Sequence, residues 1–342
     1  MTPRPIWLFA FCASSALLGC ETSGTGVAAT PPVTPPREQN LPGKPTPGHP
    51  IPLPVKFVEG RFFVEPMTQD GEPVLLYTDT GGGLFFSTSA AERLGLSVSP
   101  IEADGENIDS ILLPPFAWDA WIPPPDVLGG RMPVRPDAGK DAFGADGMLG
   151  QGWFKGRVWT FDYGEGQLMM RAAGDLPKHE AIHGTPLFFA KNASGERGAN
   201  YPRISVKIDG EVIDLLFDTG ATVTLSAAAQ ATLADGRPAT RATSFISKST
   251  FDKWAEKHPD WRKLEGADAS ANGEAMIEVP AIEVGGFSVG PVWFTRRADK
   301  NFHEQMSQWM DKKIDGALGG SALKYFRVHV DYPRGLAVFE KL

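Results

Sequence analysis

The tripeptide Asp-Thr-Gly occurs twice in this chain, at Asp79 and at Asp218, and each copy ends a run of apolar residues. The ten residues that lead to each copy, 70–79 and 209–218, align without a gap and both begin with Asp-Gly-Glu. Each segment therefore predicts a turn, a β-strand and a second turn that carries the acidic residue. A chain with this repeat is expected to build one local unit twice.

Two further pairs of segments repeat in the same order. Residues 146–150 read Asp-Gly-Met-Leu-Gly and correspond to 315–319, which read Asp-Gly-Ala-Leu-Gly. Residues 158–163 correspond to 328–332, and both end in Asp-Tyr. Three matches in one order indicate a duplicated unit. The short β-forming runs between Gly, Asn and Asp turns predict a mainly β chain.

The paired motifs resemble the aspartic proteases of the pepsin and retropepsin type. In that family an apolar strand leads to Asp-Thr/Ser-Gly and is followed later by an apolar residue and a glycine. The resemblance covers nearly everything after residue 50. It implies a mainly β, bilobal acid-protease fold, with two similar β-barrel-like lobes and a cleft between them. The second copy fits closely, whereas in the first Thr78 replaces a large apolar neighbour and Gly83 stands where Thr222 offers a hydroxyl.

This resemblance implies an aspartic endopeptidase with Asp79 and Asp218 as its catalytic dyad. Two carboxyls that lie close together cannot both ionise easily, so they share one proton and activate a water molecule for attack on a peptide carbonyl. Which carboxyl holds the proton first is left open. The expected supporting residues of the two turns are Thr80, Gly81, Thr219, Gly220 and Thr222, and the expected buttresses are Leu149, Gly150, Leu318 and Gly319.

Two turns are candidates for the tip of a flap over the substrate, one at Gly105 and one at Gly273. Neither has beside it the hydrogen-bonding aromatic residue of pepsin-type flaps. A second hypothesis is therefore a catalytically weakened, retropepsin-like lipoprotein that binds peptides or proteins. A third is a homodimer in which each Asp-Thr-Gly meets its copy in another molecule. The short link between the lobes argues against this third hypothesis.

The first residues resemble a bacterial lipoprotein signal, because Arg4 precedes an apolar stretch that ends in Leu-Leu-Gly-Cys at Cys20. We expect a signal peptide at 1–19, lipidation of Cys20 and a tether rich in Pro, Thr and Gly at 20–50. The first lobe is expected at 51–172, a linker at 173–181 and the second lobe at 182–342. The protein would then face the periplasm or the cell exterior from the bacterial cell envelope.

Composition limits the partners. The chain has 342 residues, of which 42% are hydrophobic, and a formal net charge of −8 at pH 7. This length fits two modest domains, and the acidic balance argues against nucleic acid as a partner. The expected partners are a peptide or protein substrate and a membrane, reached through the lipid anchor, and the protein is expected to be a monomer. No metal and no cofactor are expected, since the chain shows no dinucleotide-binding loop and retains no cysteine ligand after processing.

Four segments have helical patterns. The segment 249–264 is expected to be an insert without a counterpart in the first lobe. It is interpreted as a lid, a partner-docking helix, a membrane-facing helix or, as we favour, a helix packed on its own lobe. The other helical patterns lie at 89–94, 226–233 and 302–313.

Overall fold

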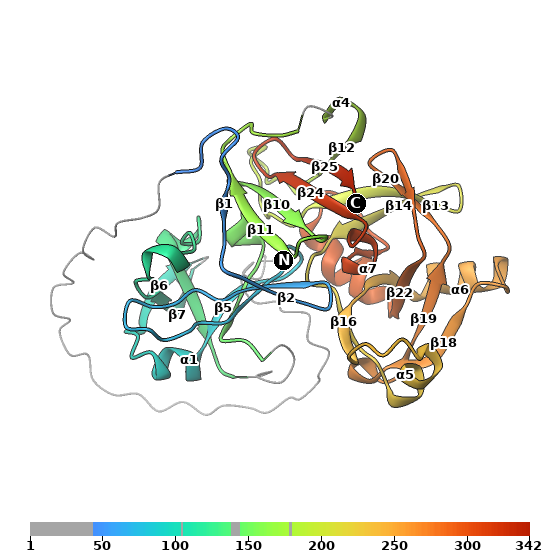
Figure 1. The fold of residues 1–342 in the computed structure, drawn as a ribbon, viewed down its shortest axis with the longest axis horizontal. Coiled ribbons are helices and arrows are strands. Elements are labelled where there is room, and N and C mark those ends of the chain that lie inside the picture. Colours follow the sequence, from blue (N-terminus) through green and yellow to red (C-terminus); the bar gives the residue numbers. More distant parts are fainter. Residues whose placement is uncertain (1–43, 104, 138–143, 178–179) are drawn as a thin grey trace.

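The structure is a computed structural model, and it describes residues 44–103, 105–137, 144–177 and 180–342. The prediction of a mainly β chain is confirmed, because most of the regular structure consists of strands in three large sheets. In Figure 1, strands from residues 55–149 lie on one side and strands from residues 203–318 on the other. A third sheet lies between these two groups.

The eight-stranded sheet leads to the first Asp-Thr-Gly. Strand β4 runs parallel to β9 with Thr78 opposite Leu149, so the chain enters Asp79 beside Gly150. In spatial order the strands are β2 (Val55–Val58), β3 (Arg61–Val64), β4 (Leu76–Thr78), β9 (Gly147–Leu149), β5 (Leu84–Ser87), β8 (Arg131–Arg135), β7 (Glu106–Leu112) and β6 (Ser99–Ala103).

The nine-stranded sheet leads to the second Asp-Thr-Gly in the same manner. Strand β14 runs parallel to β23, with Phe217 opposite Leu318. In spatial order the strands are β18 (Lys263–Asp268), β19 (Glu274–Val279), β22 (Val292–Arg297), β17 (Ser244–Ser247), β23 (Gly316–Leu318), β14 (Glu211–Phe217), β13 (Arg203–Ile208), β20 (Ile282–Val284) and β21 (Phe287–Val289).

The six-stranded sheet joins the two groups. The repeated segments 158–163 and 328–332 lie side by side, because β10 and β24 pair antiparallel with Thr160 opposite His329. In spatial order the strands are β1 (Ile51–Pro52), β11 (Gln167–Arg171), β10 (Val158–Asp162), β24 (Phe326–Asp331), β25 (Leu336–Lys341) and β12 (Gly184–Pro186). Every large sheet of the described residues has two edge strands, so the expected β-barrel-like lobes are not observed.

The repeated unit that carries Asp218, here called the second unit, contains an insertion at 222–242; the first unit carries Asp79. In the first unit β5 pairs with β9, and the amide of Ser87 donates to the carbonyl of Asp146. In the second unit the same place beside β23 is taken by β17, where the amide of Ser247 donates to the carbonyl of Asp315. The intervening residues form β15 (Thr222–Thr224), α5 (Ala227–Leu233) and β16 (Thr240–Ala242).

This arrangement corrects the expectation for 249–264. Helix α1 (Thr88–Arg93) follows β5 and α6 (Lys248–Lys257) follows β17, so α6 does have a counterpart and α5 is the extra helix. Ser87 and Ser226 cap α1 and α5 in the same way, which gives the two segments similar local patterns. Strand pairing across the sheet, which no local pattern encodes, decides the correspondence.

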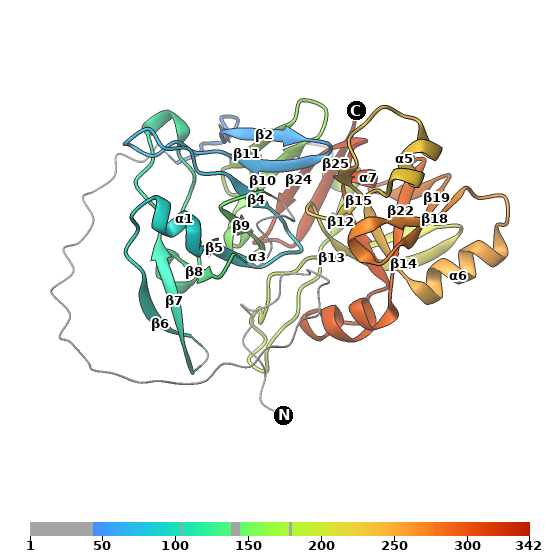
Figure 2. The ribbon, with the colours of Figure 1, turned by 90° about the horizontal axis from the view of Figure 1, so that it is seen from below.

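Helix α6 packs on its own sheet, which agrees with the interpretation favoured from the sequence. It lies along the outer side of the nine-stranded sheet (Figure 2), with Phe251 and Trp254 buried. It ends at Lys257, and Lys263 already begins β18, so the helix is shorter than expected. The pattern at 302–313 forms a π-helix and a 3-10 helix. The short helices are η1 (Trp118–Ala120), η2 (Leu128–Gly130), α3 (Gln151–Phe154), α4 (Glu180–His183), η3 (Ala269–Ala271), η4 (Asn301–Met306), η5 (Ser307–Trp309) and α7 (Gly320–Leu323).

The predicted signal 1–19, Cys20 and most of the tether 20–50 lie outside the described residues. The described end of the tether contains a turn in which Thr46 pairs with His49. Among the helices of the described chain, none has both the length and the apolar character needed to cross a membrane.

Candidate active site

The two Asp-Thr-Gly turns meet between the eight-stranded and nine-stranded sheets. Each turn is held at its start by the strand that runs parallel to the one before it. The amide of Asp79 donates to the carbonyl of Leu149 over 3.1 Å, and the amide of Asp218 donates to the carbonyl of Leu318 over 3.0 Å. The structure therefore places the two expected buttress leucines at equivalent positions behind the two aspartates.

The carboxyl groups of Asp79 and Asp218 hydrogen-bond to each other. Within each turn the glycine amide donates to the aspartate beside it, from Gly81 to Asp79 Oδ1 over 2.8 Å and from Gly220 to Asp218 Oδ1 over 3.0 Å. Asp79 remains partly exposed, whereas Asp218 is 8% exposed. Because one chain supplies both carboxyls, this site does not need a second copy of the chain.

Burial and mutual repulsion make the pair a weaker acid than two free aspartates. Burial raises the pKa of Asp79. Burial and the charge of Asp79 hold the pKa of Asp218 well above its usual range. Backbone amides oppose these shifts, because they stabilise the carboxylate form. The two groups titrate together and retain a proton to a higher pH than an isolated aspartate does.

The two threonines tie the turns together. The hydroxyl of Thr80 donates to the carbonyl of Phe217 over 2.7 Å and accepts from the amide of Thr219 over 3.0 Å. The hydroxyl of Thr219 accepts from the amide of Thr80 over 3.2 Å. Both side chains are fully buried, so water does not compete with these bonds. Each turn is thereby fixed against the other.

The glycines of the two turns are required by the close approach of the loops. A Cβ atom on Gly220 would lie 2.1 Å from Asp79 Cγ, and one on Gly81 would lie 2.7 Å from Asp218 Cγ. Both distances are too short for any side chain. Because both residues are glycines, each turn can approach the carboxyl group of the other turn.

The buttress glycines are restricted in the same way. A Cβ on Gly150 would lie 1.9 Å from the carbonyl oxygen of Gly83, and one on Gly319 would lie 2.0 Å from the carbonyl oxygen of Thr243. The spatial counterpart of Gly83 is thus Thr243, not Thr222 as the ungapped alignment suggested. The insertion 222–242 begins just beyond the turn, and for this reason the alignment fails there.

Thr78 is accommodated by a hydrogen bond. Its side chain is fully buried, and its hydroxyl donates to the carbonyl of Phe62 over 2.8 Å. The substitution of an apolar residue by Thr78 therefore leaves no unsatisfied donor in the first turn.

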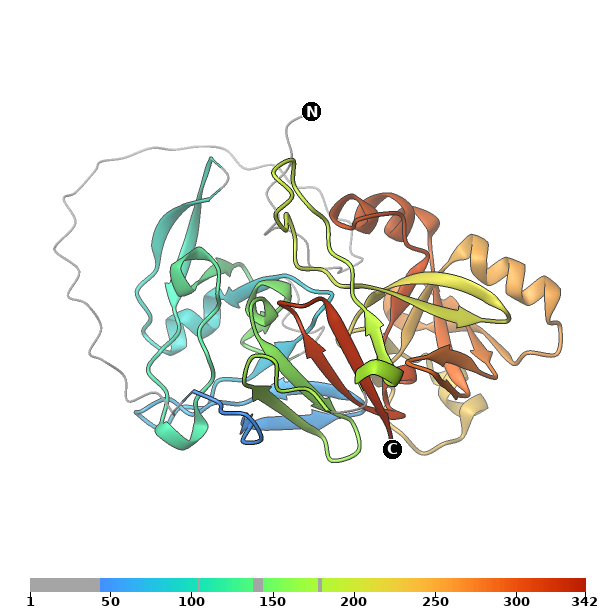
Figure 3. The same ribbon diagram turned by 90° about the horizontal axis from the view of Figure 1, so that it is seen from above.

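Tyr77 and Tyr201 belong to the surroundings of the dyad, and no sequence motif indicates either residue. The hydroxyl of Tyr77 donates to the carbonyl of Gly220 over 2.7 Å. A long hairpin connects β12 to β13 and projects from the sheets in Figure 3. Tyr201 lies at the base of this hairpin, just before β13. Burial and then the charge of Asp79 raise the pKa of Tyr201. Tyr77 sits in an apolar strand, where a sequence pattern indicates core packing.

Both expected flap turns exist as hairpin turns. Gly105 lies between β6 and β7 with φ +80°, and a Cβ there would meet nothing within 4 Å. Gly273 lies between β18 and β19 and follows Asn272 and the one-turn helix η3, so this turn is longer than a two-residue hairpin turn. The carboxylate of Asp268 caps η3 by accepting from the amide of Ser270, which stabilises the extra turn.

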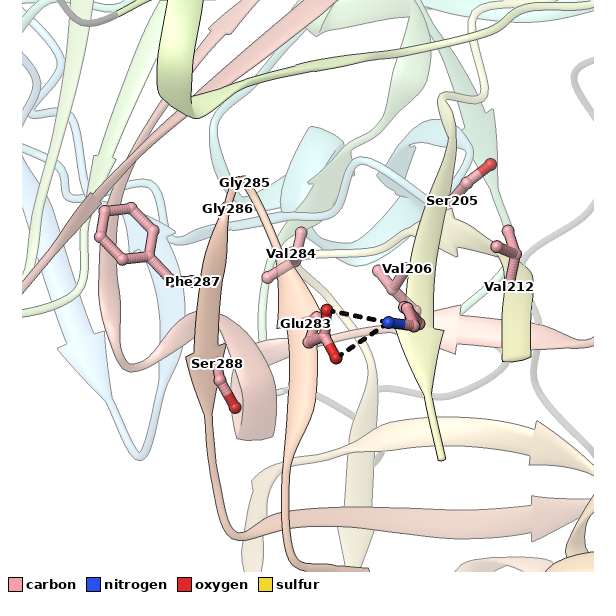
Figure 4. Close-up of a pocket in the computed structure, with 10 residues that line it drawn as sticks. Ser205, Val206, Val212, Glu283, Val284, Gly285, Gly286, Phe287 and Ser288 are labelled. Carbon is pink, nitrogen blue, oxygen red and sulfur yellow. Dashed lines mark hydrogen bonds and ion pairs between the residues drawn. The ribbon is translucent and has the colours of Figure 1, made fainter. Parts of the chain in front are cut away.

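The second unit also contains a hollow of about 410 Å³, and Figure 4 shows the residues that line it. It is formed by β13, β14, β20 and β21 and contains neither catalytic candidate. Lys207 Nζ reaches both carboxylate oxygens of Glu283 across it, at 3.3 and 3.4 Å. This ion pair is largely exposed and does not indicate a binding site by itself.

The chain contains one pair of histidines at a spacing typical of metal sites, which counts against the expectation that no metal binds. Residues 179–183 read His-Glu-Ala-Ile-His, a pattern that occurs in zinc enzymes. His179 lies outside the described residues. The ring of His183 stacks on Phe287, and its Nδ1 lies 2.9 Å from the carbonyl oxygen of Gly285. No group of three potential metal ligands occurs within the described ranges.

Comparison with known proteins finds a resemblance among solved structures. No protein-family model matches the chain, and no curated protein matches it. Among solved structures, a retropepsin-like aspartic protease from Rickettsia conorii is similar, with 14% sequence identity and a TM-score of 0.26. The match covers 45% of this chain and 92% of that one.

Proposed function

We propose that this protein is an aspartic endopeptidase with Asp79 and Asp218 as its catalytic dyad. The observation that carries the proposal is the hydrogen bond between the carboxyls of Asp79 and Asp218, which come from two equivalent turns of one chain. Because the pKa values are raised, the pair retains the shared proton that this chemistry needs. The matched turns and their threonine bonds support a bilobal acid-protease arrangement, with one lobe at 51–172 and the other at 182–342.

The dyad would hydrolyse a peptide bond without a covalent intermediate. The charged carboxylate takes a proton from a bound water, and the oxygen of that water attacks the peptide carbonyl carbon. The protonated partner donates a hydrogen bond to the carbonyl oxygen as negative charge develops there. Proton transfer to the leaving nitrogen then allows the C–N bond to break. The fixed positions of the two turns keep both carboxyls oriented during these steps.

An extended peptide is the substrate that fits this proposal, because a strand-like backbone can be held by hydrogen bonds to loops and hairpins. The hairpins at Gly105 and Gly273 are proposed to cover it. The N-terminal sequence supports a lipoprotein anchored through Cys20, which acts as a monomer at the bacterial cell envelope.

The test is cleavage of a mixed peptide library between about pH 3 and 7 by the chain that begins after Cys20, with Asp79→Asn and Asp218→Asn as variants. We expect cleavage by the wild type and its loss in both variants, because neither carboxyl can perform both proton transfers. A matched control is Asp209→Asn, which alters a carboxylate outside the dyad that pairs with Lys257 and His258. Loss in only one variant would disprove the shared dyad. Peptide binding without cleavage by a folded wild type would favour the binding-protein hypothesis.

A further inference from the structure

The two turns of the dyad are not supported equally. Tyr77 and Leu216 occupy the same place in their motifs, each two residues before the aspartate. Each reaches the glycine of the other turn. The hydroxyl of Tyr77 meets the carbonyl of Gly220, whereas a methyl of Leu216 lies 2.8 Å from where a Cβ of Gly81 would be. Leucine has no donor, so only the second turn receives a hydrogen bond from this position.

The carbonyl of Gly220 is held by two hydroxyls. Tyr77 donates to it over 2.7 Å and Thr222 donates to it over 2.9 Å, and the two hydroxyl oxygens lie 2.9 Å apart. Thr222 is the first residue of the insertion 222–242. The first turn has Gly83 at the same distance from its aspartate and therefore has no hydroxyl there.

Gly220 connects this carbonyl directly to a catalytic candidate, because its own amide donates to Asp218 Oδ1 over 3.0 Å. A glycine has no Cβ to restrict its backbone, so bonds to its carbonyl help to fix where its amide points. The amide of the next residue, Ala221, lies 3.5 Å from the backbone carbonyl of Asp218. The hydroxyl of Tyr77 is thus linked through one residue to the carboxyl of Asp218.

Tyr77 is itself rigidly placed. It is fully buried, and its ring packs against Phe63 with 4.9 Å between ring centroids. A buried hydroxyl is costly unless it is hydrogen-bonded, which favours a single orientation toward Gly220.

We propose that Tyr77 is a positioning residue that holds Gly220, so that the Gly220 amide stays aimed at the Asp218 carboxyl. This inference rests on the proposed function. It gives the two aspartates unequal surroundings, although their turns are repeats of one another. Asp218 is the member of the pair whose carboxylate form depends on the tyrosine.

The test is Tyr77→Phe, which removes the hydroxyl and keeps the ring. We expect kcat to fall about tenfold with little change in KM, because one buried hydrogen bond that orients the dyad is lost. The upper limb of the pH–rate profile should move to higher pH, since a weaker amide bond stabilises the Asp218 carboxylate less. The other titratable groups that interact with the dyad are Tyr163, Tyr201 and Tyr332, and Arg61 interacts with Tyr77 itself. The variant leaves all four in place.

The matched control is Tyr163→Phe. Tyr163 is also buried and senses the charge of Asp218, but its hydroxyl has no hydrogen-bond partner among the described residues. We expect wild-type kcat and an unchanged pH profile for this variant. A second variant, Thr222→Val, should weaken kcat, and its effect should not add fully to that of Tyr77→Phe, because both hydroxyls act on one carbonyl.

Wild-type kcat and pH profile in a folded Tyr77→Phe protein would overturn the inference, and so would an equal loss in Tyr163→Phe. If the wild type cleaves nothing, the proposed function fails and the inference is decided by ¹³C NMR titration of the aspartate carboxyls. Tyr77→Phe must then raise the upper apparent pKa of the pair, and an unchanged titration would refute the role of the tyrosine.

Discussion

Gly220 has no room for a methyl group, because a Cβ there would lie 2.1 Å from Asp79 Cγ. Gly220→Ala must therefore push the two turns apart. We expect cleavage to fall about a hundredfold or more, since a displacement of about 1 Å misaligns the dyad. We also expect a loss of about 1–3 kcal/mol in the free energy of unfolding. Peptide cleavage and thermal unfolding measure the two effects.

Gly198→Ala is the control for this residue. Its Cβ would meet neighbours at ordinary distances of 3.6 Å and longer, and its φ is not in the positive region. Activity and stability should change little. A fully active Gly220→Ala enzyme would show that the two turns do not need to approach so closely.

At the scale of secondary-structure elements, α6 is a covering helix of the nine-stranded sheet. Trp254 is buried and contacts Phe294 of β22 with 5.4 Å between ring centroids. Trp254→Ala should lower the free energy of unfolding by about 3–5 kcal/mol, because a large buried ring is replaced by a void. Chemical denaturation measures this change.

The opposite face of α6 provides the comparison. Lys253 forms an exposed ion pair with Glu211 at 2.6 Å. Lys253→Ala should cost less than about 1 kcal/mol, because solvent screens such pairs. A small effect of Trp254→Ala would instead indicate that α6 opens as a lid.

At the scale of the whole molecule, the titration of the dyad is coupled to folding. The pKa of Asp218 is raised well above its usual range, because the folded chain buries the group beside Asp79. A raised carboxyl pKa favours the folded state when the group is protonated, at pH values below its unfolded pKa of about 3.9. As pH rises toward the folded pKa, this contribution is lost.

Asp218→Asn should therefore raise the melting temperature relative to wild type near neutral pH, and the difference should shrink toward pH 3. Thermal unfolding of both proteins between about pH 3 and 7 measures this difference. A difference that does not depend on pH would contradict the buried, coupled dyad.

The residues of the two repeated motifs could be located from the sequence, because each performs a local task, whereas Tyr77 and Tyr201 could not. The two aspartates, the threonines that follow them and the Leu-Gly pairs lie together as the repeat suggested. The mainly β composition and the hairpins around Gly105 and Gly273 also follow from alternation and turn residues. The order of strands within each sheet does not follow from these patterns.

The sequence by itself determined that one strand-and-turn unit is built twice and that two Asp-Thr-Gly turns are available to one chain. It did so because the apolar runs, the glycines and the threonines act over a few neighbouring residues. The tertiary structure alone decided that β17 rather than β15 lies beside β23, and that Tyr77 reaches the turn of Asp218. Both depend on contacts between residues far apart in the chain, and a single local pattern is compatible with several such contacts.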